Sequence, residues 1–81
     1  MRTGRPGRAA SAAPGSDLRG ADLTGADLTE AWLSDTDFTG ANLTNAILVD
    51  AGGSRTRLTS TIVTGANFTG AAFRYLRTGG I

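Results

Sequence analysis

The 81-residue chain contains neither cysteine nor histidine, and these two absences exclude much of the chemistry that enzymes commonly use. Without cysteine, disulfides, thiolate nucleophiles and thiolate-bound metals are excluded. Without histidine, the side chain that most often acts as a general base at neutral pH is missing. We therefore predict that the chain is not an enzyme and that it has no catalytic residues, no metal site and no cofactor.

Long apolar segments and a strong net charge are also absent. No run approaches the roughly 20 apolar residues that cross a membrane as a helix. Residues 1–8 are basic, but no apolar segment follows them, so they do not resemble a secretory signal. The net charge of +1 gives no overall attraction to nucleic acid. We expect a cytoplasmic protein with no membrane contact and no direct contact with nucleic acid.

What the sequence does contain is a repeat of five residues. Twelve consecutive units run without insertion from residue 16 to residue 75, and every unit except the one around Gly53 has a large apolar residue at its centre. A small residue stands two positions before each centre, as Ala21 does before Leu23. We predict that the apolar centres form a stacked core, which comprises Leu18, Leu23, Leu28, Leu33, Phe38, Leu43, Leu48, Leu58, Val63, Phe68 and Phe73.

A period of five fits neither an α-helix nor a flat strand. Five residues turn a helix through about 500°, so successive centres would point in different directions. In a strand, an odd period places successive centres on opposite faces. The pattern does fit a chain that turns a corner once in each unit, and the glycine that ends many units suits such a corner.

Four units in each coil would place residues twenty apart above one another. One such column holds Leu18, Phe38 and Leu58. In another column Gly53, which has no side chain, stands between two residues with large side chains. The columns are chemically uniform, so the sequence predicts an all-β solenoid of about three coils.

The units ADLTG at residues 21–25 and ANLTN at residues 41–45 carry a motif that resembles the pentapeptide-repeat family. The resemblance extends from residue 16 to about residue 75. It implies a right-handed quadrilateral β-helix in which the centre residue and the small residue two places before it point inward. We therefore divide the chain into a disordered basic N-terminal tail (1–15), the β-helix (16–75) and a C-terminal tail (76–81).

Two regions are candidates for an interaction surface. Trp32 occupies an outward position, where it either anchors a partner or lies flat over Gly52 one coil further on. The last coil, with Phe73, Tyr75 and Leu76, is predicted to be poorly covered and so to be available for self-association. The alternatives for this end are that the tail folds over it or that the chain is part of a longer repeat protein.

Charge is divided along the predicted axis. Residues 17–50 hold seven acids and one arginine, a net of −6, whereas residues 51–81 hold four arginines and no acid, a net of +4. Head-to-tail stacking of two copies would bring opposite charges together. Alternatively, opposite charges within one molecule hold coil on coil, as Arg57 and Asp37 would do. The aspartates that precede the centres are expected to bond to local backbone at the corners, because successive faces point them in different directions.

These features predict a non-enzymatic module that acts as a structural or protein-interaction scaffold with an unknown partner. The resemblance implies an alternative, because some pentapeptide-repeat proteins imitate B-form DNA, bind DNA gyrase or topoisomerase IV and protect bacteria from quinolone-type inhibitors. Duplex DNA carries one charge in about 1.7 Å, so three coils, about 14 Å tall, would need roughly eight net negative charges. Residues 16–81 carry seven acids and five arginines, a net of −2, which disfavours this alternative.

Overall fold

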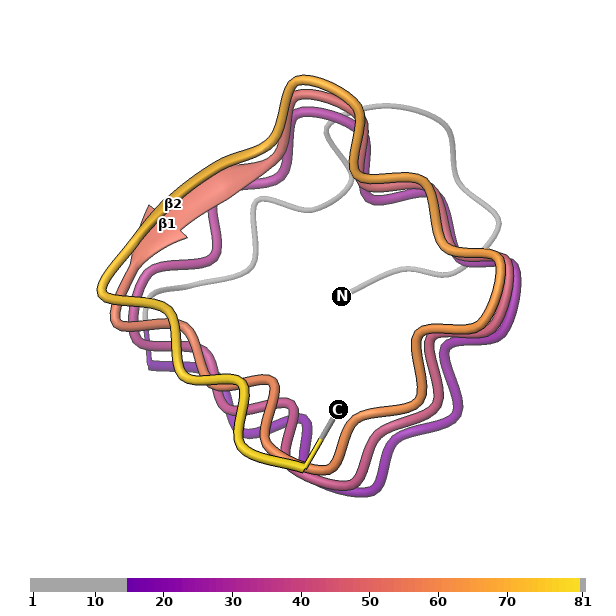
Figure 1. Ribbon diagram of the computed structural model, residues 1–81, viewed down its shortest axis with the longest axis horizontal. Coiled ribbons are helices and arrows are strands. Elements are labelled where there is room, and N and C mark those ends of the chain that lie inside the picture. The colour runs from indigo at the N-terminus through magenta and orange to yellow at the C-terminus, as the bar shows by residue number, and fades with distance from the viewer. Residues whose placement is uncertain (1–14, 81) are drawn as a thin grey trace.

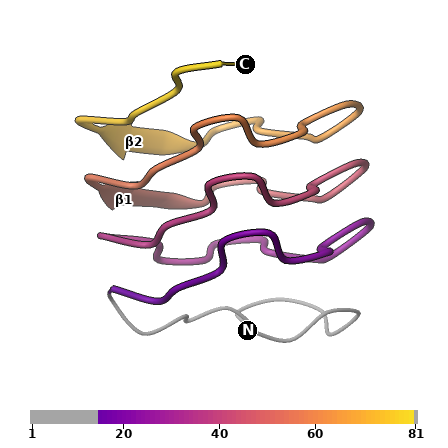
Figure 2. The same ribbon diagram turned by 90° about the horizontal axis from the view of Figure 1, so that it is seen from below.

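The computed structural model describes residues 15–80, which wind as a right-handed solenoid around one axis (Figures 1 and 2). Backbone bridges join Asp17 to Asp37 and Asp37 to Arg57, always in parallel orientation. Asp22 pairs with Asn42 in the same way on the next face. The predicted spacing of twenty residues between stacked positions is therefore confirmed, and Figure 1 shows the coils superposed as a four-cornered outline. The predicted N-terminal tail lies outside the described residues, apart from Gly15.

Strand structure is short and there is no helix within residues 15–80. The two strands are β1 (Gly52–Ser54) and β2 (Ala72–Arg74), which pair in parallel with Gly53 opposite Phe73. The other faces are joined by isolated bridges. Strands stay this short because each five-residue unit has to include a corner. The architecture is the all-β solenoid that the repeat predicts.

The corner of each unit is its fifth residue, which adopts a left-handed backbone conformation. Glycine accepts this conformation without steric cost, as at Gly25 with φ of 71°. Other residues also occupy it, including Arg55 and Tyr75, which pay a penalty of roughly 1–2 kcal/mol relative to glycine. The full set of non-glycine corners is Glu30, Asp35, Asn45, Asp50, Arg55, Ser60 and Tyr75.

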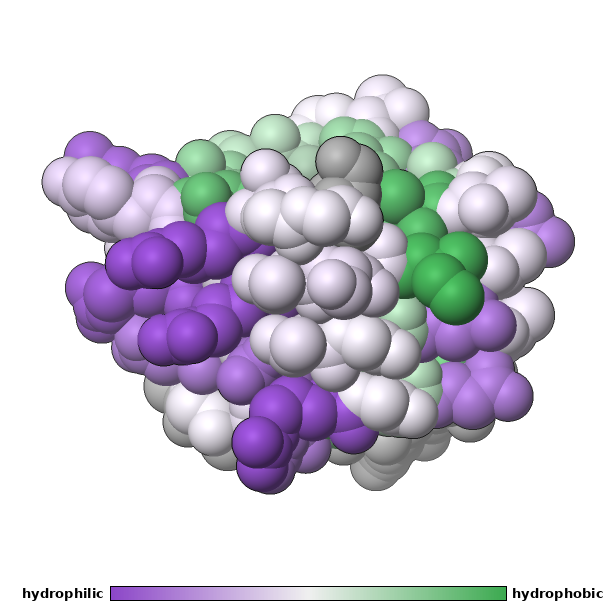
Figure 3. Space-filling view, turned by 60° about the horizontal axis from the view of Figure 1, so that its bottom comes forward, coloured by the Kyte–Doolittle hydropathy of each residue, from purple (hydrophilic) through white to green (hydrophobic). Residues whose placement is uncertain are grey.

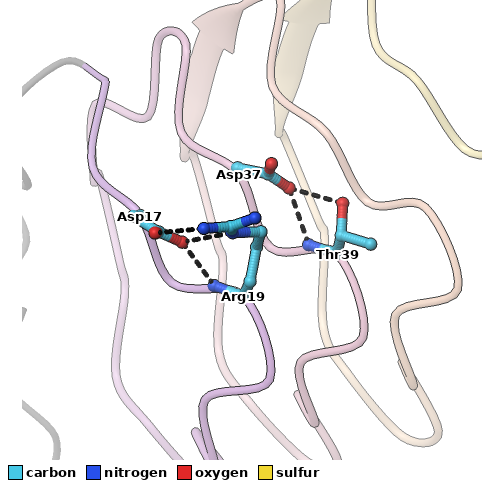
Figure 4. A network of polar contacts seen from close by, with 4 residues as sticks. All are labelled: Asp17, Arg19, Asp37 and Thr39. Atoms are coloured by element: carbon cyan, nitrogen blue, oxygen red, sulfur yellow. Dashed lines mark hydrogen bonds and ion pairs between the residues drawn. The ribbon is translucent and has the colours of Figure 1, made fainter.

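The aspartate or asparagine at the second position of a unit holds the following turn together. In Figure 4, Asp37 Oδ1 accepts hydrogen bonds from the Thr39 backbone N–H at 2.9 Å and from the Thr39 hydroxyl at 2.5 Å. Asn42 makes the same two contacts with Thr44. These bonds to residues two places ahead confirm the expected role at the corners.

The core consists of the apolar centres together with the small residues two places before them. Leu28, Leu33, Phe38 and Leu43 are fully buried, and Leu23, Leu48 and Leu58 are nearly so. The residues of the predicted stack nearest the two ends are only partly buried and pack against this cluster: Leu18, Val63, Phe68 and Phe73. The core is therefore tightest in the middle of the solenoid.

The hydrogen-bond ladder extends beyond residue 75, where the sequence predicts that the β-helix ends. Arg77 pairs with Arg57, and Leu58 N donates to Arg77 O at 2.7 Å. Ser60 N donates in turn to Gly79 O at 2.8 Å. Residues 76–80 thus form a further unit instead of a tail. The prediction placed the end too early because backbone pairing does not need the side-chain motif that is lost there.

Candidate interaction surface

The C-terminal end of the solenoid carries an apolar hollow of about 390 Å³. Val63, Phe68 and Phe73 are the centres of the last three units that keep the repeat motif. They line the hollow and are only partly buried because no described coil lies beyond them. Figure 3 shows apolar residues along the upper rim of the view, where this end of the molecule lies. The remaining lining residues are Leu58, Ala71, Leu76 and Thr78.

The structure brings three of the four predicted surface residues to this end. Phe73 and Leu76 line the hollow, and Leu76 is 36% exposed. Tyr75 stands at the adjacent corner with 74% of its surface exposed. Trp32 is not part of this surface, since it lies on the side wall of the solenoid, paired with Gly52 of the next coil.

Trp32 is both exposed and supported from the next coil. The residue is 61% exposed, and a Cβ atom placed on Gly52 would lie 3.5 Å from Trp32 Cζ3. The indole thus lies next to Gly52, where a side chain on that residue would touch it. The position over glycine that the register predicts is the position observed, and the exposed ring remains accessible.

Within residues 15–80, one salt bridge joins successive coils. Arg55 Nε donates to Asp35 Oδ1 at 2.7 Å, and Arg55 Nη2 donates to Asp35 Oδ2 at 3.1 Å. The predicted pair between Arg57 and Asp37 does not form within residues 15–80, because Asp37 turns back to Thr39. The Arg55 contact lowers the pKa of Asp35 below its usual value.

The pKa values of Asp17 and Asp22 are also shifted, by neighbours in the same corner. Hydrogen bonds from Arg19 lower the pKa of Asp17 to about 2. The hydroxyl and backbone N–H of Thr24 lower the pKa of Asp22 in the same way. These two carboxylates are therefore each held by their own turn. Residues 15–80 hold no group of three or more acidic side chains that could bind a metal ion.

A second, polar hollow of about 190 Å³ lies on the side of the solenoid, lined by Asp35, Arg55, Arg57 and Arg77. The sequence interpretation missed it. A signal was present, since charged residues recur twenty apart at 35 and 55 and at 57 and 77. The part of the chain that the structure describes has no helix long and apolar enough to cross a membrane.

The repeated coil, the inward centres and the surface-exposed loops define a solenoid repeat protein. The family model described as pentapeptide repeats matches residues 10–40 and 36–74, with eight copies of the repeat. The chain belongs to the pentapeptide-repeat family.

Solved structures similar to this chain include a pentapeptide repeat protein from the Arabidopsis thaliana thylakoid lumen, with 24% identity and a TM-score of 0.45. That match covers 80% of this chain and 48% of the plant protein, so the chain spans about half of its length. A pentapeptide repeat protein from Nostoc is 26% identical, with a TM-score of 0.32 and coverage of 80% of this chain and 68% of its own. One from the cyanobacterium Cyanothece is 32% identical, with a TM-score of 0.28 and coverage of 79% and 50%. No curated protein matches the chain.

Proposed function

We propose that this chain is a non-enzymatic structural scaffold that binds through the C-terminal end of its solenoid, and that the occupant of this end is a second copy of the chain. The observation that carries the proposal is the apolar hollow lined by Val63, Phe68 and Phe73. Pentapeptide-repeat proteins are generally structural repeat scaffolds, which agrees with a role in contact with a partner.

The backbone at this end supports the proposal, because ladder N–H groups there have no acceptor within the described residues. Leu23 N donates to Asn42 O, and Leu43 N donates to Ile62 O, each across to the following coil. Val63 is the next residue in this column, and its N–H has no such acceptor within the described residues. An unpaired edge of this kind is a template for another extended chain.

Charge favours a head-to-tail arrangement of the two copies. Residues 51–81 carry four arginines and no acid, whereas residues 17–50 carry the seven acids. Contact between the basic end of one copy and the acidic coils of another brings opposite charges together. Tail-to-tail contact would instead oppose Arg74 and Arg77 to the same arginines of the second copy.

The alternative, DNA mimicry toward DNA gyrase or topoisomerase IV, has less support. A DNA mimic needs negative charge along its whole length, and no acid follows Asp50. Among the acids that are present, Asp17 and Asp35 are already paired with arginines of the same molecule. The side wall near the C-terminal end is basic instead.

The proposal is tested by sedimentation velocity over a range of protein concentrations in low salt. We expect the weight-average sedimentation coefficient to rise with concentration for the natural sequence. Leu76→Arg places a cation in the apolar hollow and should abolish this rise. Ile62→Arg is the matched control, because Ile62 is 49% exposed and lies on the side wall.

A chain that stays monomeric up to millimolar concentration would refute the proposal. An equal loss of association in both variants would also contradict it, since the side wall would then be the contact. If the Leu76→Arg variant associates in low salt but not in high salt, the contact between copies depends on charge alone. In that case the C-terminal end would not be the docking surface.

A further inference from the structure

The geometry points to a second binding site on this molecule, a surface site for a phosphoryl group between Arg57 and Arg77. These two residues line the polar hollow of about 190 Å³ together with the Arg55–Asp35 pair. The hollow belongs to the side wall, so it is separate from the apolar end. In Figure 3 the most strongly hydrophilic residues gather on the left flank of the molecule, below the apolar residues of the upper rim.

The charges around this hollow do not balance. Arg55 and Asp35 neutralise each other through two hydrogen bonds. Arg57 and Arg77 form no ion pair with any described residue. The hollow therefore carries about two uncompensated positive charges, one from each of these arginines.

The nearest acid in the same column does not supply the missing counter-charge. Asp37 pairs with Arg57 in the backbone ladder, but its Oδ1 atom accepts two hydrogen bonds from Thr39. Arg57 only helps to lower the pKa of Asp37 through space, after the larger effect of the Thr39 bonds. Both guanidinium groups thus keep their donors for a ligand.

The positions of the two arginines suit a tetrahedral oxyanion. Arg57 and Arg77 are paired across neighbouring coils, which places their backbones about 4.8 Å apart. Two guanidinium groups that extend side by side from the wall can donate hydrogen bonds to different oxygens of one phosphoryl group. A phosphate monoester carries a charge of −1.5 to −2 near pH 7, which matches the charge of the hollow. Binding such an anion also removes the repulsion between two like charges on adjacent rungs.

The site is open to solvent, so its affinity for a single small anion should be modest. We expect a dissociation constant for inorganic phosphate on the order of 1 mM at low ionic strength. The test is an NMR titration that follows the arginine Nε–H signals, with inorganic phosphate as the probe and chloride at equal ionic strength as its control. The protein is kept at a dilution where sedimentation gives a single species, so that self-association does not affect the result.

The double variant Arg57→Gln/Arg77→Gln should weaken phosphate binding about tenfold or more. Arg74→Gln is the matched control, because Arg74 is an exposed arginine of β2 that does not line the hollow, and it should bind phosphate like the natural sequence. Circular dichroism checks that both variants keep the fold. A second titration with a short phosphoserine peptide shows whether the site binds a phosphoryl group on a peptide more tightly than it binds inorganic phosphate.

A saturable response to phosphate that chloride does not reproduce and that the double variant loses would support the site. An equal response to chloride, or an equal loss in Arg74→Gln, would overturn it, because binding would then reflect general charge. Failure here would leave the scaffold proposal intact, since that proposal depends on the end of the solenoid and not on this wall.

Discussion

Three threonines are buried inside this solenoid, and they differ in whether their hydroxyl groups form hydrogen bonds. Thr56 Oγ1 donates to Leu33 O at 2.7 Å, and Thr61 Oγ1 donates to Phe38 O at 2.7 Å. Thr36 occupies the same column as Thr56 and is also fully buried, but its hydroxyl has no hydrogen-bond partner among the described residues. A buried hydroxyl without a partner costs stability, whereas a paired one contributes to it.

This difference predicts opposite effects for the same substitution one coil apart. Thr36→Val removes a hydroxyl that has no partner among residues 15–80 and should raise the free energy of unfolding by about 1 kcal/mol. Thr56→Val removes the bond to Leu33 O and should lower that free energy by about 1 kcal/mol. Urea denaturation followed by circular dichroism measures both values. A destabilised Thr36→Val variant would mean that this hydroxyl does have a partner.

At the scale of the single coil, Gly53 is required by the close approach of two backbones. A Cβ atom on Gly53 would lie 2.7 Å from Leu33 C and 2.7 Å from Ser34 N, closer than any ordinary contact. The sequence interpretation described Gly53 as a missing side chain between two large residues. The structure shows that the backbone of Leu33 and Ser34 in the preceding coil occupies this space, so the position has no room for a larger residue.

Gly53→Ala should therefore destabilise the protein by about 3 kcal/mol, because one of the two coils has to move. Gly25→Ala is the matched control: its Cβ would meet no atom within 4 Å, and only the left-handed backbone would oppose it. We expect that control to cost about 1 kcal/mol. Equal losses in the two variants, measured by urea denaturation, would show that the coils can separate at β1 without penalty.

Most of the coil could be predicted from the sequence, because a strict period of five fixes which residues stack. The register between Asp22 and Asn42 follows from this period together with four units in each coil, which the uniform columns indicate. The salt bridge could not be predicted in the same way. Arg55 and Arg57 are both twenty residues from an aspartate, but Arg55 stands at a corner and bonds to Asp35, whereas Asp37 is held by its own turn. The direction of each side chain decides which arginine forms the salt bridge, and the spacing in the sequence does not specify that direction.

For the whole molecule, the aspartates make stability depend on pH. The folded-state pKa values of Asp17, Asp22, Asp35 and Asp37 all lie below their usual value, so the unfolded chain binds more protons in acid. The stability that these groups contribute is fully present above about pH 4 and is lost as the pH falls toward 2. Denaturation curves recorded between pH 7 and pH 2.5 should show this loss.

Asp37→Asn sharpens this test. The asparagines of this chain, Asn42 and Asn67, make the same contacts to the threonine two places ahead, so the amide should preserve the turn. The variant should fold at pH 7 and lose less stability on acidification than the natural sequence, because one shifted carboxylate has been removed. A pH dependence identical to that of the natural sequence would show that the Asp37 turn does not contribute to acid sensitivity.

The two ends and the wall of the solenoid give the molecule its proposed interactions. We propose that the apolar end lined by Phe68 and Phe73 binds a second copy of the chain, and that Arg57 and Arg77 on the wall bind a phosphoryl group. The first proposal depends on the C-terminal end of the ladder, whereas the second depends on the stacking of coils, which places Arg57 and Arg77 on neighbouring rungs.

Small-angle X-ray scattering in low salt, as a function of concentration, tests the central claim most directly. Head-to-tail stacking predicts that the maximum dimension grows with concentration while the cross-sectional radius stays constant, and that Leu76→Arg stays at the dimension of one chain. A cross-section that widens with concentration, or a particle that stays the size of one chain throughout, would contradict association through the C-terminal end.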